Sequence, residues 1–145
     1  MYVIDASVLV ADARPSEPNH TEAHHLLSLI IARRLPVFAP VIALAEVAAA
    51  LSRGTGDASI ARGFITQLQQ ISLFHFIPVD NTLGQQAAAL AAEHQIRGCD
   101  AIYVALAEAR STTLITLDHQ QRERVPLQVK AYTPAEELTN LLQDN

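Results

Sequence analysis

Four acidic side chains lie where a carboxylate is unusual. Asp5 follows the apolar run YVI, and Asp118 follows the mostly apolar run LITL. Glu46 interrupts the apolar stretch VIALAEVAAAL, and Asp100 directly follows IRGC. An unpaired charge in an apolar setting costs several kcal/mol or more unless something neutralises it. A shared counter-charge is therefore expected if these side chains are buried together.

A divalent cation is the counter-charge that this chemistry favours. Carboxylates at close range raise one another's pKa, so four of them should not all stay ionised without help. Oxygen ligands without a cluster of Cys or His favour a hard ion, Mg²⁺ or Mn²⁺. Such an ion suits the hydrolysis of phosphate esters. The sequence thus predicts a metal-binding and catalytic set of Asp5, Glu46, Asp100 and Asp118.

Alternating strands and helices are predicted to position these acids. Apolar and β-branched runs predict strands at 2–5, 37–39, 74–79, 112–118 and 127–132. Helical periodicity and caps predict helices at 7–13, 16–34, 40 to the RGTG stop at 53–56, 57–73, 80–96, 100–110 and 133–143. This order predicts a single domain, 1–145, with a three-layer α/β/α fold and a central parallel sheet of about five strands. Sites in such sheets form at the carboxyl ends of the strands, where Asp5 and Asp118 lie.

Each acid also has a purely structural interpretation. Asp5 could serve only as the N-cap of the following helix. Asp100 could simply complement a helix dipole, and Asp118 could be an ordinary residue of a strand-to-turn junction. Glu46 could lie on an exposed helix face, although its neighbours are Ala, Val, Leu and Ile. The four positions together favour the metal site.

Composition narrows the class of protein. The chain has 145 residues, of which 50% are hydrophobic and 17% charged, which is enough for a well-covered core. Its single cysteine, Cys99, cannot form an internal disulfide, so we expect a reducing cytoplasmic location. The sequence predicts neither a signal peptide nor a membrane span. The net charge of −5 gives no basic footprint of nucleic-acid binding, but a site built of acids contributes to that charge.

The motifs that carry the four acids resemble those of a known family. VIDASVLV, VIALAEVAAALSR, CDAIYVALAEA and LITLD occur in the order and spacing of the PIN-domain ribonucleases, in particular the VapC-type toxins of toxin–antitoxin pairs. The resemblance covers nearly the whole chain and implies a PIN-like fold. It implies that Asp5, Glu46, Asp100 and Asp118 hold Mg²⁺ or Mn²⁺, and that Ser7 and Thr116 support the site.

The activity and the partners are implied by the same resemblance. It implies an endoribonuclease that hydrolyses RNA with a metal-activated water and leaves a 5′-phosphate and a 3′-hydroxyl. A cognate antitoxin protein and a homodimer are the implied partners, besides the RNA substrate. Apolar residues of the first half could form a partner groove or a dimer face, although each also suits the core: Leu26, Ile30, Phe64 and Leu68.

The sequence departs from the family pattern after the fourth motif. Many members carry a further acid there, whereas this chain has His119 and Gln120, which puts a second metal ion in doubt. Four arginines are candidates for a basic rim, although surface residues of this type are usually only solvated: Arg53, Arg97, Arg122 and Arg124.

Other motifs favour structural roles. His20 and His24 have the i, i+4 spacing of zinc ligands, but the segment HTEAH differs from HExxH, so we interpret them as surface histidines. Cys99 is predicted to be a small core residue.

Two alternative functions stay open at this point. A PIN-like module could bind RNA or a partner without cleaving it. A HAD-like phosphatase also begins with an aspartate at a strand end, but it requires a second Asp where this chain has Ser7, and a downstream lysine, for which only Lys130 is available.

Overall fold

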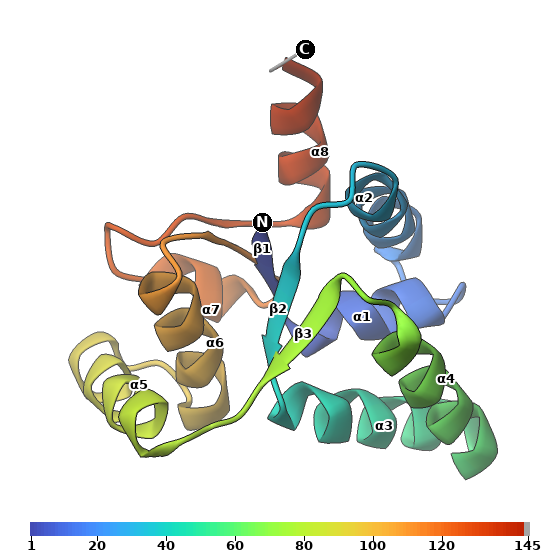
Figure 1. Ribbon diagram of the computed structural model, residues 1–145, viewed down its shortest axis with the longest axis horizontal. Helices are drawn as coiled ribbons and strands as arrows, with labels where there is room; N and C mark the ends of the chain where they lie inside the picture. The colour runs from blue at the N-terminus through green and yellow to red at the C-terminus, as the bar shows by residue number, and fades with distance from the viewer. Residues whose placement is uncertain (144–145) are drawn as a thin grey trace.

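A five-stranded parallel sheet forms the centre of the molecule, as the computed structural model of residues 1–143 shows (Figure 1). The strand order is β3-β2-β1-β4-β5, and every neighbouring pair is parallel. The strands are β1 (Tyr2–Ile4), β2 (Val37–Pro40), β3 (Phe74–Ile77), β4 (Thr113–Ile115) and β5 (Ala131–Tyr132). The predicted parallel sheet of about five strands is confirmed.

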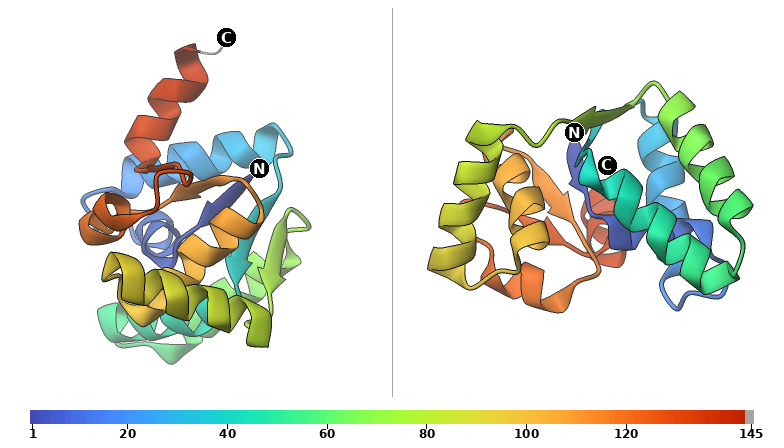
Figure 2. Two further views of the ribbon diagram at one scale, coloured as in Figure 1. Left: turned by 90° about the vertical axis from the view of Figure 1, so that its left-hand side faces the viewer. Right: turned by 90° about the horizontal axis from the view of Figure 1, so that it is seen from below.

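Helices cover both faces of this sheet. They are α1 (Ala6–Ala13), α2 (His20–Ala32), α3 (Ile42–Thr55), α4 (Ala58–Gln70), α5 (Asn81–His94), α6 (Gly98–Ala109), α7 (His119–Arg124) and α8 (Pro134–Gln143). Figure 1 shows α5, α6 and α7 on one side of the sheet and α1, α2 and α4 on the other, and the view from below in Figure 2 shows the same separation. The three-layer α/β/α arrangement is therefore confirmed.

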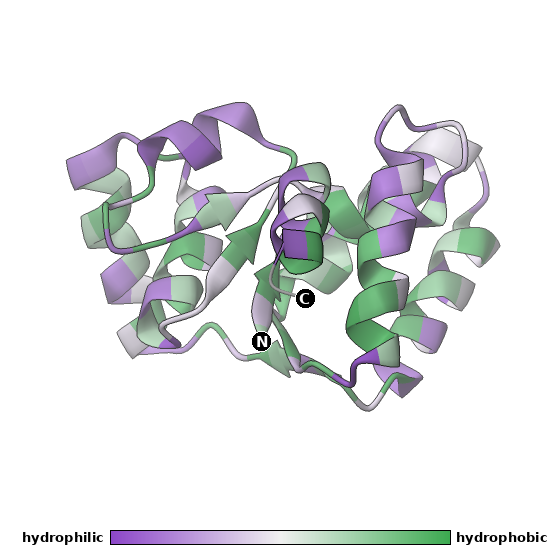
Figure 3. Ribbon diagram, turned by 90° about the horizontal axis from the view of Figure 1, so that it is seen from above, coloured by the Kyte–Doolittle hydropathy of each residue, from purple (hydrophilic) through white to green (hydrophobic). Residues whose placement is uncertain are grey.

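The central strand is apolar because both of its faces are covered. Tyr2, Val3 and Ile4 of β1 are all buried, and β1 lies between β2 and β4. Strands of parallel sheets with helices on both faces read as continuous apolar runs for this reason. Figure 3 shows hydrophobic residues along the strands and hydrophilic ones along the outer helix surfaces. Within residues 1–143, no helix has the length and hydropathy needed to cross a bilayer.

Two element predictions were wrong in an instructive way. Pro40 was expected to open a helix, but it ends β2, where it pairs with Ile77, and α3 begins only at Ile42. Proline has no N–H to donate to the sheet, and the N–H of the next residue, Val41, donates to the carbonyl of Ile77 at 2.8 Å. The last strand was expected at 127–132, but only Ala131 and Tyr132 pair with β4, and Leu127 is fully exposed. The other predicted ranges differ from the observed ones by a few residues at their ends, and the RGTG stop is confirmed by the left-handed Gly56 (φ 71°) after α3.

A buried pair ties the start of the chain to its last helix. The Tyr2 hydroxyl donates a 2.6 Å hydrogen bond to Oε1 of Glu137, and the Asn140 side chain donates to Oε2 at 3.1 Å. Tyr2 is 6% and Glu137 7% exposed. A buried carboxylate that loses a donor carries an uncompensated desolvation penalty. This bond therefore helps to hold α8 on the body of the protein.

We expect Tyr2→Phe to lower the free energy of unfolding by about 1–3 kcal/mol, because it removes the hydroxyl that donates to the buried Glu137 carboxylate. Urea denaturation measures this loss. Tyr132→Phe is the matched control, since it removes a hydroxyl from a half-buried tyrosine of β5, and a change within about 0.5 kcal/mol is expected. Equal losses in the two variants would contradict the role assigned to Tyr2.

Candidate active site

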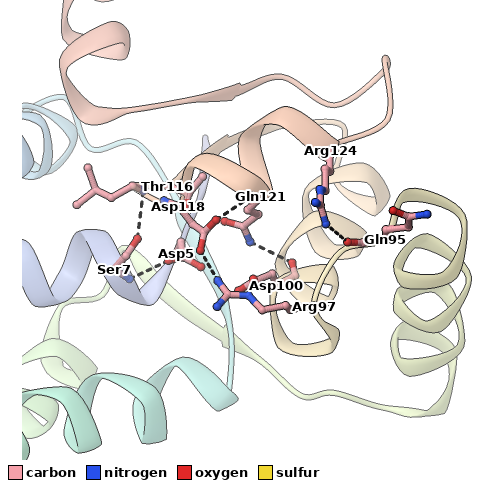
Figure 4. A network of polar contacts seen from close by, with 10 residues as sticks. Asp5, Ser7, Gln95, Arg97, Asp100, Thr116, Asp118, Gln121 and Arg124 are labelled. Carbon is pink, nitrogen blue, oxygen red and sulfur yellow. Dashed lines mark hydrogen bonds and ion pairs between the residues drawn. The ribbon is translucent and has the colours of Figure 1, made fainter.

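One cleft receives all four predicted acids. It has a volume of about 750 Å³, and its lining includes Asp5, Glu46, Asp100, Asp118 and also Ser7. Asp5 follows β1 and Asp118 lies beyond β4, while Glu46 belongs to α3 and Asp100 to the first turn of α6. Residues far apart in the chain thus meet at the carboxyl edge of the sheet, as expected for an open α/β sheet. Figure 4 shows three of them, Asp5, Asp100 and Asp118, close together.

Asp5 is the most buried acid of the cleft, with 6% of its surface exposed. It is the N-cap of α1, and its Oδ2 accepts a 2.8 Å hydrogen bond from the backbone N–H of Ser7. The pKa of Asp5 is raised to about 6, first by burial and to a lesser degree by the nearby charges of Glu46 and Asp100, against the lowering effect of the Ser7 hydrogen bonds. The capping role considered in the sequence analysis is therefore confirmed, and the raised pKa of Asp5 is a second feature of this carboxylate.

Asp100 and Asp118 share one arginine. Arg97 Nε lies 2.8 Å from Oδ2 of Asp100, and its second guanidinium nitrogen forms an ion pair with Oδ2 of Asp118. Burial raises the pKa of Asp100, and the hydrogen bond and charge of Arg97 act in the opposite direction. The same hydrogen bond raises the pKa of Arg97. Asp118 is also the N-cap of α7, where its Oδ1 accepts from the backbone N–H of Gln121 at 2.8 Å. The two carboxylates thus already converge on a positive group.

Glu46 is half-buried at the cleft, where it contacts a buried tyrosine. The hydroxyl of Tyr103, a fully buried residue of α6, donates a 2.7 Å hydrogen bond to Oε1 of Glu46. Burial, reinforced by the charges of Asp5 and Glu46, raises the pKa of Tyr103, so its hydroxyl stays protonated and remains a donor. Sequence reasoning missed Tyr103, although it lies one helical turn after Asp100 and therefore on the same side of α6.

The two predicted supporting residues shape the turn that follows β4. The hydroxyl oxygen of Ser7 accepts from the backbone N–H of Leu117 at 3.1 Å, and that of Thr116 accepts from the N–H of Asp118 at 3.0 Å. Thr116 is fully buried and does not line the cleft, whereas Ser7 does. Both hydroxyls hold backbone near Asp118, which fixes where its carboxylate lies.

The arginines divide into two pairs. Arg53 and Arg97 line the cleft. Arg122 forms an ion pair with Glu136, and Arg124 donates to the backbone carbonyl of Gln95. Only the first pair is therefore placed to form a basic rim.

The structure also places Cys99 and the two histidines His20 and His24. Cys99 is exposed, so the prediction that it is a core residue was wrong. It lies in the first turn of α6, where no earlier turn of the helix shields its side chain from solvent. The rings of His20 and His24 stack 5.6 Å apart, and His24 contacts Asp12.

The first-half apolar residues are mostly committed to the core. Leu26, Ile30 and Leu68 are buried, and Phe64 is partly buried against them. Leu26, Ile30 and Leu68 are therefore not available as an open groove for a partner, whereas part of Phe64 is exposed.

The donor chemistry of the cleft fits a hard divalent cation. All four acids offer carboxylate oxygens, the ligands that Mg²⁺ and Mn²⁺ prefer. Arg97 shows that Asp100 and Asp118 can satisfy one shared cation. Within residues 1–143, no group of three or more His, Cys, Asp or Glu side chains lies in an arrangement that could hold a metal ion without movement. Binding an ion therefore requires these side chains to draw together around it.

Comparison with known proteins gives a family and a set of similar folds. The family model described as PIN domain matches residues 2–125. VapC20 of Mycobacterium tuberculosis, described as a toxin that cleaves the sarcin–ricin loop, superposes with a TM-score of 0.75 at 17% identity, over 90% of this chain and 99% of that one. A toxin–antitoxin complex from Klebsiella pneumoniae gives 0.66 at 20% identity, over 92% and 98%.

A third structure, FitAcB of Neisseria gonorrhoeae, gives a TM-score of 0.65 at 24% identity, over 93% of this chain and 99% of that one. At these identities the likeness is one of fold. No curated protein matches the chain by sequence.

The raised pKa of Asp5 predicts a pH dependence of stability in EDTA. A carboxyl whose pKa rises from 3.8 unfolded to about 6 folded binds more protons when folded, so its contribution is greatest below pH 3.8 and is lost as the pH rises through 6. Asp5→Asn keeps a capping oxygen and removes this titration. We expect the variant to gain stability relative to the wild type between pH 4 and 7, by up to about 3 kcal/mol. Urea denaturation at several pH values measures the difference, and a constant difference would contradict the assigned pKa.

Proposed function

The chain belongs to the PIN domain family, and from this premise we propose that it is a Mg²⁺- or Mn²⁺-dependent endoribonuclease, the toxin of a toxin–antitoxin pair. One observation carries the proposal: four carboxylates, from the residue after β1, from α3, from α6 and from the turn after β4, line a single cleft at the carboxyl edge of the sheet. A fold shared with VapC20 and with other toxin structures supports the same activity. Membership of the PIN domain family gives no support to the alternative of a HAD-like phosphatase.

Each residue of the cleft has a role in this proposal. Asp5, Glu46, Asp100 and Asp118 hold the metal, and Tyr103 keeps Glu46 oriented through its hydrogen bond. A divalent cation, when bound, lowers the pKa of a coordinated water and stabilises charge on the scissile phosphate. Water adds to phosphorus as the bond to the 3′-oxygen breaks, which leaves a 5′-phosphate and a 3′-hydroxyl.

The basic residues of the cleft have a second role. Arg53 and Arg97 line it and are exposed, so they can contact phosphates of the RNA backbone. With a divalent cation as the counter-charge of Asp100 and Asp118, the guanidinium of Arg97 would be free to contact phosphate. The net charge of the chain is −5, which would repel RNA. Two arginines beside the acidic site provide local positive charge for the phosphates of this substrate.

A cognate antitoxin is the proposed protein partner. Similar toxins have been crystallised in toxin–antitoxin complexes, such as that of Klebsiella pneumoniae. The guanidinium of Arg97 already satisfies two acids of this cleft, so an arginine supplied by a partner is chemically suited to the same acids. Such a system acts in the cytoplasm, which is the location we propose. Assembly as a homodimer stays a prediction.

Glu46→Gln separates a nuclease from a binding module. The change keeps size and helix propensity but removes a charged ligand. We expect it to fold, to bind RNA as the wild type does, and to lose more than about 100-fold in cleavage rate, since even residues that only orient metal ligands contribute 10–100-fold. Glu93→Gln, an exposed acid of α5, is the matched control and should cleave normally. The assay follows site-specific cuts in total RNA, tRNA and hairpin oligonucleotides with Mg²⁺ or Mn²⁺.

Two outcomes would contradict the proposal. Equal cleavage by the wild type and Glu46→Gln would place the activity in a contaminant or another site. A wild-type protein that binds RNA and cuts none of it would favour the non-catalytic module.

Growth arrest on expression without a partner, relieved by Glu46→Gln, would agree with the toxin role.

A further inference from the structure

Helix α7 is joined to its neighbours by several polar contacts. Its six residues, HQQRER, include no hydrophobic side chain, so the hydrophobic effect contributes little to its position. Gln121 is its single buried residue, with 1% of its surface exposed. A fully buried glutamine is uncommon, and it needs hydrogen-bond partners to be tolerated. What Gln121 contacts therefore determines where α7 lies.

Gln121 connects two of the proposed metal ligands. Its backbone N–H donates to Oδ1 of Asp118 at 2.8 Å, and its side-chain Nε2 donates to the backbone carbonyl of Asp100 at 3.0 Å. Figure 4 shows the side chain reaching from α7 to the start of α6, between these two acids. Arg124, three residues later, donates to the carbonyl of Gln95 just before α6. Both contacts tie α7 to the segment that carries Arg97 and Asp100.

The amide is not the residue that packing alone would favour here. Among residues 1–143, Oε1 of Gln121 is buried without a hydrogen-bond partner. A buried unpaired acceptor is destabilising, and an apolar side chain of the same length avoids that penalty. The useful feature of the amide is therefore its Nε2 donor, which fixes the distance between the first turns of α6 and α7.

We propose that Gln121 is a positioning residue that sets the spacing between the Asp100 and Asp118 carboxylates so that both can bind one divalent cation. The inference rests on the proposed function, because it assigns Gln121 a role at the same site. Gln121 contacts neither metal nor RNA in this role. Its backbone N–H is capped by the Asp118 carboxylate, and its side chain donates to the backbone carbonyl of Asp100, so it links the two segments that carry these acids.

The test compares Gln121→Met with the wild type. Methionine keeps the length of the side chain and removes both the donor and the unpaired acceptor. In EDTA the variant should melt no lower than the wild type. Its dissociation constant for Mn²⁺, measured by calorimetry, should rise 10–100-fold, as is typical for residues that orient metal ligands. Saturating Mn²⁺ should restore most of the RNA cleavage rate. Gln120→Met, at an exposed neighbouring position of α7, is the matched control and should change neither property.

The outcomes are distinguishable. Wild-type Mn²⁺ affinity in Gln121→Met would overturn the positioning role and leave the proposed function standing. A wild-type protein that binds no Mn²⁺ would overturn both. If Gln121→Met is poorly folded, Gln121→Leu repeats the test, and unfolding of both variants would overturn the inference by showing that the fold itself needs the amide.

Discussion

The burial of the Asp5 carboxylate is the constraint on which the site depends. Asp5 follows a central strand that is covered on both faces, and it lies where the strand order of the sheet changes direction between β1 and β4. Open α/β sheets form their sites at such a point because the connections on either side diverge and leave a crevice. Here the crevice receives Glu46 from α3 and Asp100 from α6, and their charges oppose ionisation of Asp5. The fold thus concentrates negative charge in a place poorly solvated by water.

The chain compensates this charge only in part. Arg97 neutralises Asp100 and Asp118 from the rim, with 67% of its side chain exposed. Asp5 and Glu46 receive neutral donors instead, the Ser7 N–H and the Tyr103 hydroxyl. In the part of the chain that the structure describes, no ion pair involves Asp5 or Glu46. In the function that we propose, a divalent cation supplies the missing charge, and the polar contacts of Ser7, Thr116 and Gln121 hold the backbone around its ligands.

The sequence predicts most of the fold because local patterns determine it. Apolar runs gave the strands around β1, and the alternation of strands and helices gave the parallel sheet. The four acids were found because a carboxylate in an apolar run is locally anomalous. Tyr103 and Gln121 carry no such local signal, since a tyrosine in an apolar helix and a glutamine in a polar one look ordinary. Their roles arise from packing between α6, α3 and α7, as does the exposure of Cys99 at a helix start. Such contacts depend on tertiary structure, which periodicity and propensity do not specify.

The decisive measurement is the binding of Mn²⁺ to the wild type and to Asp5→Asn at neutral pH, followed by electron paramagnetic resonance of the free ion. We propose that the buried carboxylate that follows β1 is a ligand of a divalent cation. The wild type should then remove Mn²⁺ from solution in a saturable way, and Asp5→Asn, which keeps the helix cap, should bind at least ten times more weakly, by about 1.4 kcal/mol or more. Equal binding by the two proteins would contradict it, because Asp5 would then be only a buried cap.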